Sequence, residues 1–245
     1  KGVCAPFPVG ELLTTHNGIC NITEYEGGLS CCADKSILLD EDQDITHFKI
    51  DHWRLKYRFY FEEYTQQLNS FRVWWSTEAW NNEFDVPKST ADCLDPKTPA
   101  EECTHLIKSN FTGQQFLEAQ CMTSDPLSCG NATKIREEHG GWWQLTYAAF
   151  HCHAPACMSG ELWNADTGEL ICRNTALYGN GTEIENEKGY VVGIPPCVWG
   201  SEAEGLLPPP KIHLDSNLTT VKRTNNTNAH WGVMALWQSR GAYLS

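Results

Sequence analysis

Length, composition and charge exclude several classes of protein at the outset. The chain has 245 residues, 41% of them hydrophobic, which is enough to bury the core of one large β domain or two small ones. Its formal net charge of −13 argues against nucleic-acid binding, because that function needs a basic surface. No run of about 18 uncharged apolar residues occurs, so we expect no transmembrane segment.

The cysteines indicate disulfide bonds rather than a zinc site. Twelve are present, and no pair has the Cys-x-x-Cys spacing of a zinc knuckle. An even number scattered through loop-like sequence is typical of an oxidising compartment, so we expect all of them to be bonded. The predicted disulfide cysteines are Cys4, Cys20, Cys31, Cys32, Cys93, Cys103, Cys121, Cys129, Cys152, Cys157, Cys172 and Cys197.

Asn-x-Thr sequons point independently to the same compartment. Each one predicts an exposed asparagine that carries an N-linked glycan in a secreted protein. The predicted glycosylation sites are Asn21, Asn110, Asn131, Asn180, Asn217 and Asn225. The chain also begins at Lys1 without an apolar leader, so we expect that a signal peptide was removed or that the chain is a fragment. Together these signals predict an extracellular protein.

The first third of the chain is expected to contain a lead-in and two strands. Residues 1–46 have little periodicity and four cysteines, which predicts a disulfide-pinned lead-in to a domain spanning residues 47–245. Aromatic residues alternate with basic ones from Trp53 to Phe61, as in a half-buried strand. A second strand is expected at Phe71–Trp75.

Residues 85–141 are expected to form a long inserted loop. The segment is rich in prolines and contains four cysteines and two sequons. Cysteines are expected to staple it, because a structureless loop of this length is unusual in a compact domain. A short helix is predicted within it, at Glu101–Lys108.

The rest of the chain predicts short strands joined by turns. A β-prone run from Trp142 leads to His151-Cys152-His153, and turn chemistry at residues 164–168 predicts a β-hairpin on either side. Further strands are expected at Gly189–Ile194, Lys211–Leu214 and Trp231–Trp237, with a glycosylated loop at 216–228. Short strands without a long helix predict an all-β antiparallel sandwich.

The His-x-His triplet is the main candidate site. Residues two apart on a strand face the same way, so His151 and His153 are expected to present two imidazoles together while Cys152 points elsewhere. Two polar histidines on a solvated face are the open alternative. Copper in its cuprous state favours imidazole and thioether ligands, and Met234 on a distant strand suits the third position. His230 competes for that position and would shift the preference toward cupric copper or zinc.

Several motifs give the chain a resemblance to a known family. Their order along the chain, over about residues 17–240, resembles the carboxy-terminal part of the stress up-regulated nodulin family. The motifs are Gly27–Cys32, the aromatic strand around Trp53, His151–His153, Tyr178–Gly179, Asn186–Val192, Cys197 and His230–Met234.

That family is in turn similar to copper-dependent, ascorbate-reduced monooxygenases that hydroxylate peptidylglycines. The resemblance implies a jelly-roll-like sandwich that binds one copper through His151, His153 and Met234. Those enzymes also use an adjacent His-His pair at a second copper, and this chain has no such pair. The expectations are therefore a secreted single-copper protein with oxidative chemistry or, alternatively, a non-catalytic structural or adhesive glycoprotein that self-associates, as a filament subunit would.

Overall fold

The computed structural model describes residues 70–76, 83–119, 129–153, 156–181, 188–189 and 191–244. Several predictions lie outside these residues, among them the lead-in, the Trp53–Phe61 strand and the Asn21 sequon. The cysteines outside them are Cys4, Cys20, Cys31, Cys32 and Cys121.

Strands make up most of the described secondary structure. They are β1 (Ser70–Ser76), β2 (Glu83–Val86), β3 (Thr104–Thr112), β4 (Trp142–His151), β5 (Cys157–Asn164), β6 (Glu169–Thr175), β7 (Leu177–Tyr178), β8 (Val191–Gly193), β9 (Cys197–Val198), β10 (Lys211–His213), β11 (Asn217–Asn225), β12 (His230–Met234) and β13 (Leu236–Tyr243). The helices are α1 (Gly113–Glu118), α2 (Ala132–His139) and the 3-10 turns η2 (Ala100–Cys103) and η4 (Glu202–Glu204).

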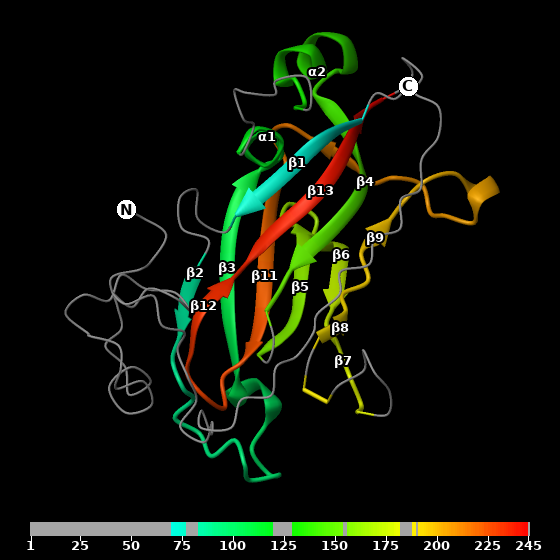
Figure 1. The fold of residues 1–245 in the computed structure, drawn as a ribbon. Coiled ribbons are helices and arrows are strands. Elements are labelled where there is room, and N and C mark those ends of the chain that lie inside the picture. The colour runs from blue at the N-terminus through cyan, green and yellow to red at the C-terminus, as the bar shows by residue number, and fades with distance from the viewer. Residues whose placement is uncertain are drawn as a thin grey trace, which may run out of the picture.

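Two antiparallel sheets form a sandwich, which confirms the predicted fold class (Figure 1). The first sheet has the order β1-β13-β4-β10, with β9 paired to β4. The second sheet has the order β3-β11-β5-β6. Two smaller ribbons, β12-β2 and β7-β8, complete the pairing. The helices α1 and α2 lie together at one end of the sandwich (Figure 1).

The predicted hairpin is present as β5 and β6. The side chain of Asn164 accepts hydrogen bonds from the backbone N–H groups of Asp166 and Thr167, and Gly168 adopts a φ of 73°. Asparagine and glycine are the residues that such a turn requires, because one holds the backbone by its side chain and the other reaches positive φ without strain. The turn therefore fixes the register of the hairpin.

Large apolar side chains fill the space between the sheets. Trp143 and Trp237 are fully buried on the first sheet, and the ring of Phe150 lies against the backbone of Gly160 on the second. A Cβ atom on Gly160 would fall 2.1 Å from Cγ of Phe150, so only glycine allows the two sheets to approach this closely here. The disulfide Cys172–Cys197 ties β6 of the second sheet to β9 of the first.

Two predicted segments differ in the structure. The predicted loop 216–228 contains β11, a nine-residue strand in the interior of the second sheet. The predicted helix at Glu101–Lys108 is a single 3-10 turn followed by β3. In both cases hydrogen bonding to neighbouring strands and burial outweigh the local sequence preference. The segment expected to be one long loop, residues 85–141, therefore supplies a strand of the sandwich.

Every cysteine of the described residues is disulfide-bonded, as predicted. The bonds Cys93–Cys103, Cys152–Cys157 and Cys172–Cys197 are formed, and Cys129 is also disulfide-bonded. No cysteine of the described residues is free. Disulfides are typical of oxidising compartments, so this is compatible with secretion. In the described part of the chain, no helix is long and apolar enough to cross a membrane.

Candidate metal centre

His151 and His153 bring their imidazole rings together at the end of β4. Their Nε2 atoms lie 2.8 Å apart, and the ring planes are inclined by 81°. At this distance the two rings share a hydrogen bond, in which one Nε2–H donates to the Nε2 lone pair of the other ring. The rings therefore present two nitrogen ligands at one point.

His153 lies outside the continuous strand that the spacing predicted, because β4 ends at His151. Cys152 bonds to Cys157 at the start of β5. The backbone N–H of Cys157 also donates to the carbonyl oxygen of His153 at 3.2 Å. The disulfide and this hydrogen bond tie the end of β4 to the start of β5.

Sheet register brings Met234 to the same end of the sandwich. β13 pairs with β4 so that Leu236 lies opposite His151. Met234 precedes Leu236 by two residues and ends β12, where it pairs with Glu83 of β2. The Met234 side chain is half-buried. Strand pairing thus brings His151 and Met234, which are 83 positions apart in sequence, to the same end of the sandwich.

His230 starts the strand that Met234 ends. It pairs with Val86, four residues before Met234. A strand rises about 3.3 Å per residue, so about 13 Å of strand separates His230 from Met234.

Lys222 is the residue of this region that sequence reasoning missed. It projects from β11 into the space between the sheets, is 1% exposed and donates a hydrogen bond to the carbonyl oxygen of Met234. Its ammonium group also lies 5.8 Å from the ring centroid of Phe150. Burial lowers the pKa of Lys222 to about 8. The only sequence signal was the alternation of Leu218 and Lys222 with more exposed residues, which marks Lys222 as inward-facing once β11 is recognised as a strand.

The positive charge of Lys222 acts electrostatically on His151. Burial first, and then the positive charge of Lys222, lowers the pKa of His151. Neutral imidazole is the form that binds metal ions, so both causes favour the ligand state of His151. Lys222 therefore contacts the backbone of Met234 and acts electrostatically on His151, which places all three residues in one neighbourhood.

The buried carboxylate of Glu161 is engaged away from the histidines. Its carboxylate, 2% exposed, accepts hydrogen bonds from Arg173, Arg223 and Trp163. These residues belong to the second sheet, on the face that points away from the core. The carboxylate is thus committed to a different cluster.

The described residues around His151 do not have the composition of a structural zinc site. Within the described residues, no three or more His, Cys, Asp or Glu side chains gather to hold a metal ion. Structural zinc sites draw four ligands from these residue types, so the described part of the chain offers none. Metal–nitrogen bonds of about 2.0–2.1 Å at a tetrahedral angle need Nε2 atoms about 3.3 Å apart, so the rings would have to separate by about 0.5 Å.

The predicted glycosylation sites in the described residues are all exposed. Asn110, Asn131 and Asn225 use their side-chain oxygen to accept hydrogen bonds, from Thr219, from the backbone of Lys134 and from the backbone of Thr227. An N-linked glycan attaches to the side-chain nitrogen, so these hydrogen bonds are compatible with glycosylation.

Asn217 differs from these three. Its side-chain nitrogen donates to Asp166 at 2.7 Å. A glycan would replace one of the two hydrogens on that nitrogen and leave the other for Asp166. Three sites were expected in loops but belong to strands: Asn110 lies within β3, and Asn217 and Asn225 are the first and last residues of β11.

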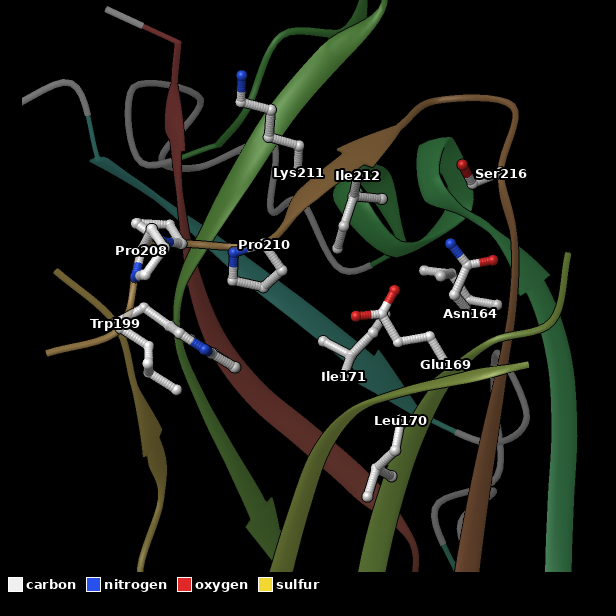
Figure 2. Close-up of a pocket in the computed structure, with 13 residues that line it drawn as sticks. Asn164, Glu169, Leu170, Ile171, Trp199, Pro208, Pro210, Lys211, Ile212 and Ser216 are labelled. Atoms are coloured by element: carbon white, nitrogen blue, oxygen red, sulfur yellow. The ribbon is translucent and has the colours of Figure 1, made fainter. Parts of the chain in front are cut away.

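A separate cavity of about 500 Å³ lies between the edges of the two sheets (Figure 2). Figure 2 shows Trp199 beside Pro208 on one side and the carboxylate of Glu169 near Ile171 on the other. None of the four predicted metal ligands lines it. The cavity and the histidine pair are therefore independent features.

These observations first define a class of protein, a disulfide-bonded antiparallel β-sandwich in which two imidazoles meet at the end of a strand. Comparison with known sequences gives the family. The sequence model of the stress up-regulated Nod 19 family matches residues 13–239, so the chain belongs to that family, as the motifs indicated. No curated protein and no solved structure matches the chain.

Proposed function

We propose that this protein is an extracellular N-glycosylated β-sandwich that binds one copper ion through His151, His153 and Met234. The observation that carries the proposal is the 2.8 Å contact between the two Nε2 atoms. A metal ion bound there would replace the proton that the rings share. The bound ion would supply one-electron chemistry. What we propose is copper binding, without a catalysed reaction.

The surroundings of the histidines support a cuprous ion in particular. Thioether sulfur has little affinity for harder cations, so Met234 as third ligand favours the cuprous state. The ammonium group of Lys222 adds positive charge nearby, and a charge of the same sign disfavours a doubly charged ion more than a singly charged one. Both effects act in the same direction.

The Cys152–Cys157 disulfide, in the connection between β4 and β5, also supports a metal site at the two histidines. It holds the residue between the two histidines against the start of β5. A site assembled on a short, cross-linked turn loses less conformational entropy when its ligands close on an ion. Reduction of the bond would free His153 to move away from His151.

The test is cuprous binding under anaerobic conditions, by competition with a chromophoric chelator. The wild-type protein should bind one equivalent, and His153→Ala should abolish binding because a single imidazole and a thioether remain. Met234→Leu nearly conserves volume and should weaken cuprous binding about tenfold or more while the fold is kept. Sulfur in the coordination shell should be visible by X-ray absorption in the wild type and lost in Met234→Leu.

Matched controls are available in the same chain. His213→Gln removes a histidine of β10, and Met158→Leu removes an exposed methionine of β5. Neither should change the affinity for copper. A wild-type protein without copper affinity would disprove the metal centre and leave a non-catalytic structural or adhesive glycoprotein as the function.

Glycosylation is tested separately on protein from a secreting eukaryotic host. Enzymatic deglycosylation should reduce the mass by several glycans, and peptide mapping should find occupancy at Asn110, Asn131, Asn180, Asn217 and Asn225, all of which are exposed. An unchanged mass would contradict passage through a glycosylating pathway. The result is independent of the copper measurement.

A further inference from the structure

The outward face of the second sheet carries a cluster of charged side chains. Residues paired across antiparallel strands share a face, so three successive rows can be followed across β3, β11, β5 and β6. The middle row contains Lys108, Val221, Glu161 and Arg173. Arg223 belongs to the adjacent row, diagonally next to Glu161. The face therefore gathers three cations around one carboxylate.

Both carboxylate oxygens of Glu161 accept hydrogen bonds from neighbouring side chains. Its Oε1 atom accepts from Nε of Arg173 and Nε of Arg223, each at 3.1 Å. Its Oε2 atom accepts from Nε1 of Trp163 at 3.0 Å. Burial would raise the pKa of Glu161, but the hydrogen bonds from Arg223 and Trp163 and the two arginine charges lower it overall. The carboxylate is thus ionised and holds both guanidinium groups in place.

The arginines remain open on their other side. Both bind the same oxygen, so their Nε atoms lie within about 6 Å of each other, and the side chains are 50% exposed for Arg173 and 41% for Arg223. A guanidinium group has further N–H donors on its two terminal nitrogens, in a fixed fork. Among the described residues, each of these guanidinium groups is engaged through Nε alone. Two preorganised forks therefore face solvent.

The charges do not cancel within the cluster. One carboxylate offsets one guanidinium, so Arg173, Arg223 and Glu161 together carry one net positive charge, and exposed Lys108 adds another. A buried carboxylate needs only one cationic partner to be stabilised, and a purely structural ion pair would be complete with a single arginine. The second guanidinium is an excess of positive charge on a chain with a net charge of −13.

We propose that this face binds an acidic polysaccharide through Arg173, Arg223 and Lys108, whose cationic groups take carboxylate or sulfate substituents. Paired guanidinium forks match the two oxygens of such an anion. The cations lie on an open sheet face, with Lys108 two strands, or about 10 Å, from Glu161, which suits an extended ligand with repeated charges. Trp163, half-buried on the same face, offers an indole edge beside the sugar. This site is independent of copper.

The test measures binding of two fluorescent polymers of defined length, oligogalacturonate and dextran sulfate, with neutral dextran as the reference. The wild-type protein should bind one or both charged polymers and not dextran, with affinity that falls as salt rises. Binding of oligogalacturonate alone would identify carboxylate as the anion, and binding of dextran sulfate alone would identify sulfate. Binding of neither polymer, or equal binding of dextran, would overturn the proposal.

Variants separate the site from general electrostatics. The double variant Arg173→Gln/Arg223→Gln should lower the affinity at least tenfold, and Lys108→Gln should lower it about twofold to threefold. Arg136→Gln is the matched control, because Arg136 is also an exposed arginine paired with a carboxylate, Asp215, but lies on α2. A control that loses as much affinity as the double variant would show a diffuse charge effect and overturn the site.

A charge-conserving variant covers the case in which the double variant does not fold. Arg223→Lys keeps a cation beside Glu161 but removes the fork, so binding should weaken several-fold while the melting temperature changes little. Unchanged affinity in Arg223→Lys would contradict bidentate recognition. The same measurements on enzymatically deglycosylated protein should give the same order of affinities, since the cations and not the glycan of Asn110 carry the binding.

Discussion

The two ends of the sandwich core are built from different chemistry. At the end covered by α1, the interior is aromatic, with Phe71, Phe116 and Trp143 packed against one another at centroid distances of 5.9 and 6.0 Å. At the opposite end of β11, the interior holds Lys222 and Thr224, both buried. The aromatic end supplies hydrophobic stabilisation, and the polar end places charge and hydrogen-bonding groups beside the candidate metal centre.

This difference shows where stability and function can be separated. Apolar burial contributes stability directly, whereas a buried amine costs free energy unless a partner compensates it. The polar end is therefore the part of the core where substitution by an apolar residue should not destabilise the protein. If the two ends divide stability and binding in this way, substitutions should lower the free energy of unfolding at the aromatic end and raise it at the polar end.

The largest effect is expected at the aromatic end. Trp143→Ala should lower the free energy of unfolding by about 3–5 kcal/mol, because a fully buried indole is replaced by a cavity. Its neighbour Trp142 is 42% exposed, so Trp142→Ala should cost less than about 1 kcal/mol. Chemical denaturation of both variants measures the difference. Equal losses would contradict the assignment of this end as the stabilising part of the core.

The next effect is a pH dependence at the polar end. The pKa of Lys222 falls from its ordinary value of 10.5 to about 8 in the folded protein. Between these values the unfolded chain binds a proton that the folded protein has lost, so stability rises with pH, on the order of 3 kcal/mol in all. The contribution should be seen in the metal-free protein as a rise between pH 8 and 10.5 that Lys222→Met removes.

Lys108→Met is the control for that measurement. Lys108 is an exposed lysine on the same sheet, so its removal should leave the rise in place. Other groups that titrate above pH 8 are common to all three proteins and cancel in the comparison. A rise that persists in Lys222→Met would place its origin elsewhere.

A smaller loss is expected at Thr220, which lies between the two ends. Its Oγ1 atom accepts a hydrogen bond from Nε1 of Trp237 at 2.8 Å, and both side chains are buried. Thr220→Val keeps the shape but leaves the indole N–H without its acceptor, which should cost about 1–3 kcal/mol. Thermal and chemical denaturation should agree on the loss, and an unchanged stability would show that the indole finds another partner.

The smallest effect, of opposite sign, is expected at Thr224. This threonine is fully buried, and its Oγ1 atom has no hydrogen-bond partner among the described residues. Thr224→Val removes a desolvated hydroxyl without changing volume much, so stability should rise by up to about 1 kcal/mol. Thr220→Val and Thr224→Val thus form a matched pair on one strand. Losses of the same size in both would contradict the difference in hydrogen bonding.

Sequence pattern predicted those parts of the fold in which local chemistry and burial agree. Asn164 and Gly168 are turn residues flanked by β-prone runs, so the hairpin of β5 and β6 could be recognised. β11 could not, because its inward positions are occupied by Thr220, Lys222 and Thr224, which by composition belong to a solvated loop. Its burial is imposed by pairing with β3 and β5 over its length.

The candidate site was predictable to a similar extent. The spacing of His151 and His153 predicted their convergence, although His153 lies beyond the end of β4. Lys222 was missed because β11 was expected to be a loop, and its inward position follows from pairing with β3 and β5. Long-range register is the information that a single sequence lacks.

The position of β3 has a consequence for the behaviour of the protein at high concentration. In the described part of the chain β3 pairs with β11 alone, so it is an outer strand of its sheet. A nine-residue outer strand is a template on which a second chain can add, and such addition leads to aggregation. Lys108 and the sequon asparagine Asn110 point outward from this strand, where a charge and a glycan would both obstruct an approaching backbone. The side chain of Lys108, and a glycan on Asn110 if the sequon is used, would therefore both oppose amyloid-like growth on this strand.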